Sequence, residues 1–118
     1  MTVRSWQSRV HALAVSKGWW DDCSKVGGAY ALTTDQILAK LALVHSEVSE
    51  ALEDVRVGKM TTTFLESGKP VGFASELADV VIRCFDLAGA MGIDLEREIE
   101  VKNAFNETRS YRHGGKSA

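Results

Sequence analysis

Apolar residues recur along the chain every three or four positions, which is the period of an amphipathic helix. In the second of four such segments the repeat runs through Ile37, Leu41, Val44 and Val48. No segment shows convincing strand-like alternation of apolar and polar residues. The pattern predicts four helices, at residues 3–17, 35–57, 71–91 and 94–108. We therefore expect an all-α protein built as a small four-helix bundle.

Residues typical of helix ends flank these segments. Glycines at 18, 58 and 92 follow the first three helices, where an αL residue commonly ends a helix. Thr33-Thr34-Asp35 precedes the second helix and Asp94 precedes the fourth, and both offer side-chain oxygens for N-capping. Residues 59–70 form a polar connector in which 61–64 is a candidate extended piece. The polar tail at 110–118 is expected to be loosely ordered.

Length and charge narrow the class of protein. The 118 residues suffice for one domain, 1–118, and the single proline permits long helices. The formal net charge of −2 argues against a general binder of polymeric nucleic acid or of membranes, which would be basic. Residues 1–18 lack the uninterrupted apolar core of a signal peptide, and the two cysteines are too few for a disulfide framework. We expect a reduced, cytoplasmic protein.

Two acidic pairs carry the candidate chemistry. Glu47 and Glu50 lie three residues apart in the second helix, and Glu76 and Asp79 do so in the third. At this spacing the two carboxylates of a pair occupy neighbouring positions on one helix face and repel each other. A divalent cation turns that repulsion into attraction, because Mg²⁺ and Mn²⁺ prefer oxygen ligands. Without a function, either pair alone would simply be part of a solvent-exposed helix face.

The angular positions of the pairs predict that they meet. At about 100° per residue, Glu47 and Glu50 lie at about −60° and −120° from Val44. Glu76 and Asp79 lie at about −40° and −100° from Val80. Both pairs therefore flank their apolar stripes on the same side, so antiparallel packing of the two helices would bring all four acids to one edge of the seam. Parallel packing would separate them.

The spacing of these motifs resembles a known family. Leu41-Ala42-Leu43-Val44 leads into Glu47-x-x-Glu50, and Glu76-x-x-Asp79 follows. Gly18-Trp19-Trp20 follows the first helix, and Lys102-Asn103-x-x-Asn106-x-x-Arg109-x-Tyr111 precedes His113-Gly114-Gly115-Lys116. Together these motifs resemble MazG-like nucleoside triphosphate pyrophosphohydrolases of the all-α NTP pyrophosphatase superfamily. The resemblance is weakest through residues 59–70.

The resemblance implies an enzyme and a metal site. Its members hydrolyse nucleoside triphosphates to a monophosphate and pyrophosphate, with Mg²⁺ bridging the substrate phosphates and a metal-activated water attacking. Glu47, Glu50, Glu76 and Asp79 would then be the catalytic metal ligands, for Mg²⁺ or for Mn²⁺ as a substitute. One of the four would also serve as the base, and the residues do not say which. Arg83, one turn beyond Asp79, is placed to neutralise that acid.

Further residues are implied in nucleotide binding. In the family, positions corresponding to Lys102, Asn106 and Arg109, with Tyr111 beside them, help to bind phosphate or sugar. The spacing of His11 and Trp20 is similar to that of a histidine and a tryptophan that contact the base in dCTP-cleaving relatives. Sequence alone does not say whether Trp19 or Trp20 faces the site. The implied role is nucleotide-pool house-cleaning on a (deoxy)nucleoside triphosphate such as dCTP, by a homodimer or homotetramer.

Other functions remain open at this stage. A non-catalytic helical oligomerisation or partner-binding module would use the same amphipathic helices and show no metal dependence. Phosphoribosyl-ATP pyrophosphohydrolase activity is the nearest alternative within the same superfamily. A di-iron carboxylate bundle expects Glu-x-x-His motifs, and none of the nine glutamates has a histidine three residues later.

Overall fold

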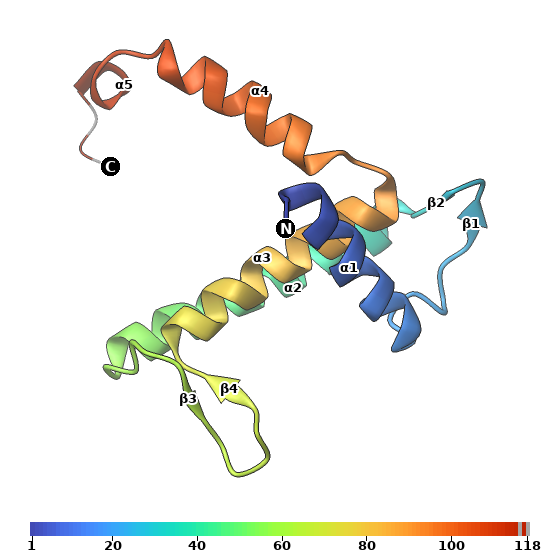
Figure 1. Ribbon diagram of the computed structural model, residues 1–118, viewed down its shortest axis with the longest axis horizontal. Coiled ribbons are helices and arrows are strands. Elements are labelled where there is room, and N and C mark those ends of the chain that lie inside the picture. The colour runs from blue at the N-terminus through green and yellow to red at the C-terminus, as the bar shows by residue number, and fades with distance from the viewer. Residues whose placement is uncertain (116, 118) are drawn as a thin grey trace.

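The computed structural model describes residues 1–115 and 117. It is mostly helical, with four helices packed together and two small hairpins between them (Figure 1). In chain order the elements are α1 (Val3–Ser16), β1 (Lys25–Val26), β2 (Ala29–Tyr30), α2 (Thr34–Arg56), β3 (Thr63–Phe64), β4 (Pro70–Val71), α3 (Phe73–Met91), α4 (Leu95–Glu107) and α5 (Arg112–Gly115).

The predicted helices are confirmed, with small differences at their ends. Thr33 caps α2 in a capping box with Gln36, and Asp94 caps α4 by accepting from the Arg97 N–H. Gly92 ends α3 in the left-handed conformation, with φ 68°. The third helix begins two residues later than predicted, because Pro70 and Val71 pair with β3. Where the sequence predicts a loose tail, α5 forms, and Lys116 of the C-terminal motif lies outside the described residues.

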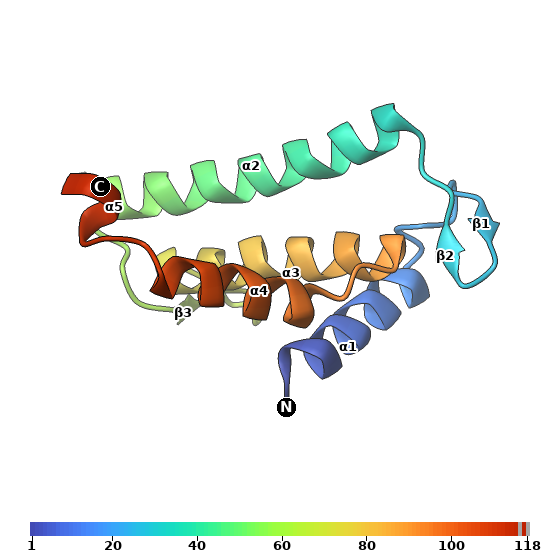
Figure 2. The ribbon, with the colours of Figure 1, turned by 90° about the horizontal axis from the view of Figure 1, so that it is seen from above.

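α2 and α3 lie side by side and run antiparallel (Figure 2). This is the orientation in which the two acidic pairs share one edge of the helix seam. The connection between them is the β3–β4 hairpin, in which Thr63 pairs with Val71 and Phe64 with Pro70. Gly72 follows the hairpin with φ 115°, and a Cβ there would clash with the carbonyl oxygen of Thr61. The tight entry into α3 therefore requires glycine.

α1 packs across α3, and α4 adjoins α1. Gly89 of α3 permits the close approach of α1, because a Cβ at this position would lie 2.7 Å from Cβ of His11. Arg4 near the start of α1 forms ion pairs with Asp94 at 2.9 Å and with Glu96 at 2.6 Å, where α4 begins. From this junction α4 extends away from α2 and α3 (Figure 1).

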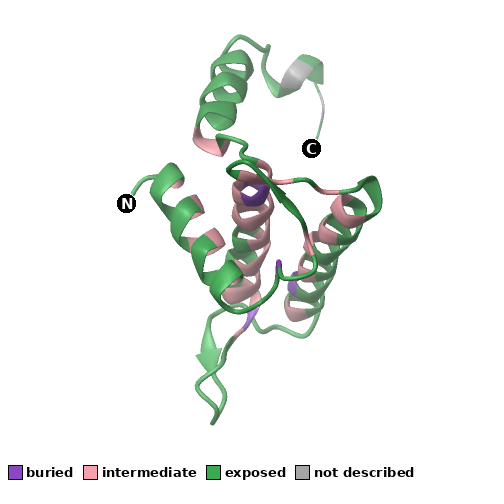
Figure 3. Ribbon diagram, turned by 90° about the vertical axis from the view of Figure 1, so that its right-hand side faces the viewer, coloured by how far each residue is buried: buried purple, intermediate pink, exposed green. Residues whose placement is uncertain are grey.

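The buried core of the single chain is small (Figure 3). Its buried hydrophobic residues, in the part of the chain that the structure describes, are Trp20, Ala51, Ala88 and Ala90. Many large residues of the predicted apolar stripes stay partly in solvent, for example Leu41 at 44% exposure and Leu77 at 48%. In the part of the chain that the structure describes, no helix has both the length and the apolar character needed to cross a membrane.

Candidate metal and nucleotide site

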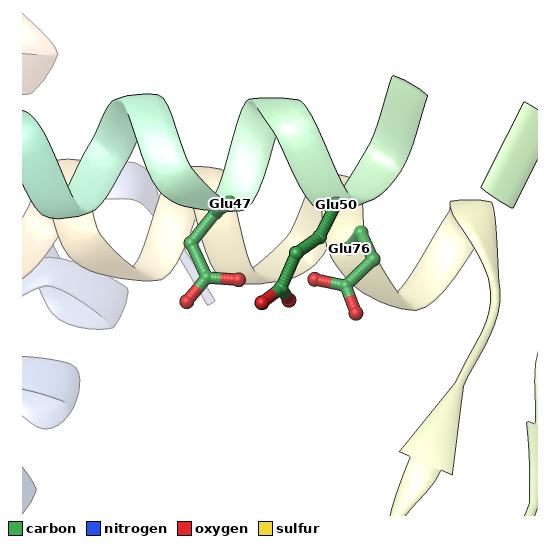
Figure 4. Close-up of side chains that lie close together, drawn as sticks. All are labelled: Glu47, Glu50 and Glu76. Carbon is green, nitrogen blue, oxygen red and sulfur yellow. The ribbon is translucent and has the colours of Figure 1, made fainter. Parts of the chain in front are cut away.

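Three of the four predicted acids converge between α2 and α3. Glu47 and Glu50 come from α2 and Glu76 comes from α3, and their side chains point toward one another (Figure 4). One carboxylate oxygen from each lies within 4.8 Å of the other two. Antiparallel packing of two i, i+3 pairs produces this arrangement, as the angular positions predict. Three oxygens at this spacing can share a single divalent cation.

Glu76 shows most directly that this cluster carries excess negative charge. Its Oε2 atom is buried and has no hydrogen-bond partner among the described residues. The pKa of its carboxyl group is raised from the usual 4.5 to about 7. Burial is the largest cause, followed by the hydrogen bond that the protonated form donates to Glu47 and by the negative charges of Glu50 and Asp79. A cation bound among these oxygens would give Oε2 of Glu76 a partner and would offset the repulsion between the carboxylates.

Arg83 holds one of the three acids in place. Its Nε donates to Oε1 of Glu47 at 2.8 Å, across the seam between α3 and α2. The Glu47 side chain is only 12% exposed, so its carboxylate has a fixed position. The expectation that Arg83 neutralises Asp79 is therefore corrected, because its guanidinium points across the seam rather than back along its own helix. Glu47 also offers a carboxylate oxygen to the group of three acids.

Asp79 lies in the same cavity but outside the group of three. The cavity has a volume of about 1060 Å³ and is lined by all four acids. It also extends along α3 to Asp86, and along α1 and the loop after it to Trp6, Trp19 and Trp20. The lining therefore runs along α3 from the acidic cluster to Asp86 and includes three indole rings.

Of the two predicted base-binding residues, Trp20 lines the cavity and His11 does not. Trp20 lines the cavity but is only 2% exposed, with the Tyr30 ring stacked on it at 5.2 Å between centroids. The ammonium of Lys40 lies 4.2 Å from the centre of the same ring. His11 is not part of the lining and contacts Trp20 edge-on behind it. Trp19, at 69% exposure, is the indole of the pair that remains open.

The C-terminal candidates lie apart from this cavity within one chain. Lys102 and Asn106 border a shallow pocket of about 300 Å³ along α4. Arg109 lies over the ring of Phe105, and Tyr111 is 85% exposed. Because α4 extends away from α2 and α3, none of these four side chains lines the acidic cavity of its own chain.

Several charged lining residues were not predicted from the sequence, among them Lys69, Lys40 and Asp86. Lys69, in the turn of the β3–β4 hairpin, reaches the cavity that holds the acids. Lys40 and Asp86 line it from α2 and α3. Asp86 could have been found, since it lies seven residues after Asp79 and shares its helix face. Lys69 could not, because its position depends on the hairpin.

Comparison with known proteins assigns this site to no family. The chain matches no protein-family profile, no curated protein and no solved structure. The resemblance noted in the sequence therefore depends on its motif residues, and functional inference depends on the geometry described above.

Proposed function

We propose that the protein is a Mg²⁺-dependent nucleoside triphosphate pyrophosphohydrolase with an all-α NTP pyrophosphatase fold. In this reaction water attacks the α-phosphorus, the bond to the bridging oxygen breaks, and a nucleoside monophosphate and pyrophosphate leave. The observation that carries the proposal is the convergence of Glu47, Glu50 and Glu76 in one large cavity, with a buried Glu76 oxygen that has no partner among the described residues. The motif resemblance points to the same chemistry.

The donor set fits a hard divalent cation. Glu47, Glu50 and Glu76 offer three carboxylate oxygens at mutual distances that one ion can span, and Asp79 lines the same cavity. Bound Mg²⁺, or Mn²⁺ in its place, would offset the charge of the phosphates and acidify the attacking water. Arg83 keeps Glu47 oriented toward this group through its 2.8 Å contact.

The remainder of the cavity suits a nucleotide. Lys69 lines the same cavity as the acids and offers an ammonium group to the outer phosphates of a triphosphate, which need positive charge. Lys40 adds a second ammonium group to the lining, over the Trp20 ring. Trp19 and Trp6 supply exposed aromatic surface, at 69% and 45% exposure, on which a planar base can stack. These features support a nucleotide substrate over a simple phosphate ester.

We also propose that the protein works as a homodimer or homotetramer. Its accessible surface is 8612 Å², whereas a compact monomer of this mass exposes about 6300 Å². Its radius of gyration of 16.8 Å likewise exceeds the roughly 13–14 Å of a compact chain of this length. A second copy packed on the exposed apolar residues would remove this excess. It would also allow Lys102, Asn106, Arg109 and Tyr111 to reach a partner's cavity.

The test is a panel of ribo- and deoxyribonucleoside triphosphates, with phosphoribosyl-ATP included, assayed for pyrophosphate release with Mg²⁺. We expect turnover that EDTA abolishes. Glu50→Gln should abolish it also, while Glu53→Gln, which changes a solvent-exposed glutamate paired with Arg56, should leave it intact. Equal activity in fully chelated protein, or equal activity of the two variants, would contradict the proposal.

A further inference from the structure

Asp86 occupies the end of the cavity away from the acidic cluster. Its Oδ1 atom accepts two hydrogen bonds, one from Nε1 of Trp20 at 2.9 Å and one from Nδ1 of His11 at 2.8 Å. A carboxylate is only an acceptor, so His11 donates its Nδ1–H in this contact. Two ring N–H groups from other elements therefore fix the orientation of the Asp86 side chain, which is 18% exposed.

The second oxygen of Asp86 is available to a ligand. Oδ2 receives no hydrogen bond from the residues that the structure describes, and it is not among their buried unpaired atoms. Within the same residues, no lysine or arginine forms an ion pair with this carboxylate. Because Asp86 lines the cavity, a ligand that enters meets an oriented, negatively charged acceptor.

The position of Asp86 along α3 matches the base end of a nucleotide. Asp79 and Asp86 are seven residues apart, so they lie on nearly the same helix face and are separated by about 10 Å along the axis. That separation is comparable to the reach from the α-phosphate of a mononucleotide to the far edge of its base. Trp19 provides open aromatic surface in the same lining, whereas Trp20 is covered by Tyr30.

We infer that Asp86 selects the base of the substrate, by accepting a hydrogen bond at Oδ2 from an exocyclic amino group of the nucleobase. The inference builds on the proposed nucleotide substrate. An aspartate oxygen is a good acceptor for the amino group of cytosine or adenine. The keto oxygen at the same ring position of uracil or hypoxanthine would face Oδ2 as a second acceptor and be repelled. His11 and Trp20 act as positioning residues, since they hold Oδ1 so that Oδ2 stays free.

Asp86→Asn is the matched perturbation. The asparagine carbonyl oxygen can still accept from His11 and Trp20, while the NH₂ group replaces the free acceptor with a donor. The variant therefore keeps the shape of the cavity wall and replaces one acceptor, Oδ2, with a donor. Asp22→Asn is the control, because Asp22 is exposed in the loop after α1 and does not line the cavity.

The experiment measures binding rather than turnover, so that it is separate from the test of catalysis. Calorimetry with Mg²⁺ compares the non-hydrolysable α,β-imido triphosphates of deoxycytidine and deoxyuridine, and then those of deoxyadenosine and deoxyinosine. Whichever pair binds, pyrimidine or purine, the wild-type protein should bind the nucleotide with the amino group at least about 10-fold more tightly than the one with the keto group. Asp86→Asn should reduce or invert that ratio by at least about 10-fold, and Asp22→Asn should preserve it.

Several results would overturn the inference. One is a wild-type protein that binds the amino and keto members equally, or that binds none of the four. Another is a folded Asp86→Asn variant, verified by its thermal transition, that weakens both members to the same extent. If the variant fails to fold, the ratio of wild-type affinities for the amino and keto nucleotides still tests the inference. Selective binding without any pyrophosphate release would uphold the role of Asp86 and contradict the proposed hydrolysis instead.

Discussion

Replacing Glu76 by glutamine should stabilise the metal-free protein at neutral and alkaline pH. At acidic pH the same substitution should have little effect on stability. Glutamine reproduces the shape and charge of the protonated carboxyl group. In the folded protein the pKa of Glu76 is about 7, against 4.5 for an unperturbed glutamate. Below about pH 4 the group is protonated in both the folded and the unfolded chain, so it contributes nothing to a pH dependence. Between the two pKa values the unfolded chain releases its proton first, so wild-type stability falls as pH rises.

The magnitude follows from the same two values. A shift from 4.5 to about 7 corresponds to about 3 kcal/mol at pH 8. Because Glu76 as a whole is only partly buried, solvent screening reduces this, and we expect Glu76→Gln to gain about 1–3 kcal/mol at pH 8.

The assay is urea denaturation in EDTA at pH 4 and pH 8, with Glu53→Gln as the control. Glu53 is 56% exposed and paired with Arg56, so its replacement should change the free energy of unfolding by less than about 1 kcal/mol. Added Mg²⁺ should then raise the stability of wild type at pH 8 more than that of Glu76→Gln. An equal effect of Glu76→Gln at both pH values would refute the description of this carboxyl group as a raised-pKa member of the cluster.

Four further predictions test other parts of the structure. Glu50→Gln and Asp79→Asn should fold with near wild-type stability but lose at least about 100-fold in kcat/KM, measured by pyrophosphate release. Both variants should also lose the rise in Tm that Mg²⁺ causes in the wild-type protein. Retained activity would mean that these acids form only a solvated helix face. Lys69→Ala should raise KM about 10-fold with little change in stability, and an unchanged KM would remove Lys69 from phosphate binding. Gly89→Ala should lower stability by about 1–3 kcal/mol in thermal denaturation, because its methyl group meets His11, and a stabilised variant would contradict that packing. Sedimentation velocity should show a dimer or tetramer at micromolar concentration, whereas a monomer would contradict the proposed assembly.

Much of the fold could be predicted because helices are determined locally. The period of apolar residues, the cap at Thr33 and the stop at Gly92 all act within a few residues of chain. The convergence of Glu47, Glu50 and Glu76 was also predictable, because angular position on a helix follows from residue number alone. It required only that α2 and α3 pack antiparallel.

Other features depend on contacts between distant segments and left no local signal. Trp20 is buried because Tyr30, in a hairpin of two-residue strands, stacks on it, and nothing in the Trp19-Trp20 pair distinguishes the two rings. Arg83 pairs with Glu47 across the seam rather than with its neighbour Asp79. The long apolar stripes on four helices are more than a compact monomer of this length could bury, and many of their residues do stay exposed. Periodicity marks a face as apolar without saying which of its residues its own chain covers.

The most direct test of the proposed function is hydrolysis of a preferred triphosphate in ¹⁸O-labelled water, with the products separated and weighed by mass spectrometry. The proposal predicts a nucleoside monophosphate and pyrophosphate in equal amounts, with the label in the monophosphate, because water attacks the α-phosphorus. Nucleoside diphosphate and labelled orthophosphate as the first products would contradict it, as would label found in the pyrophosphate.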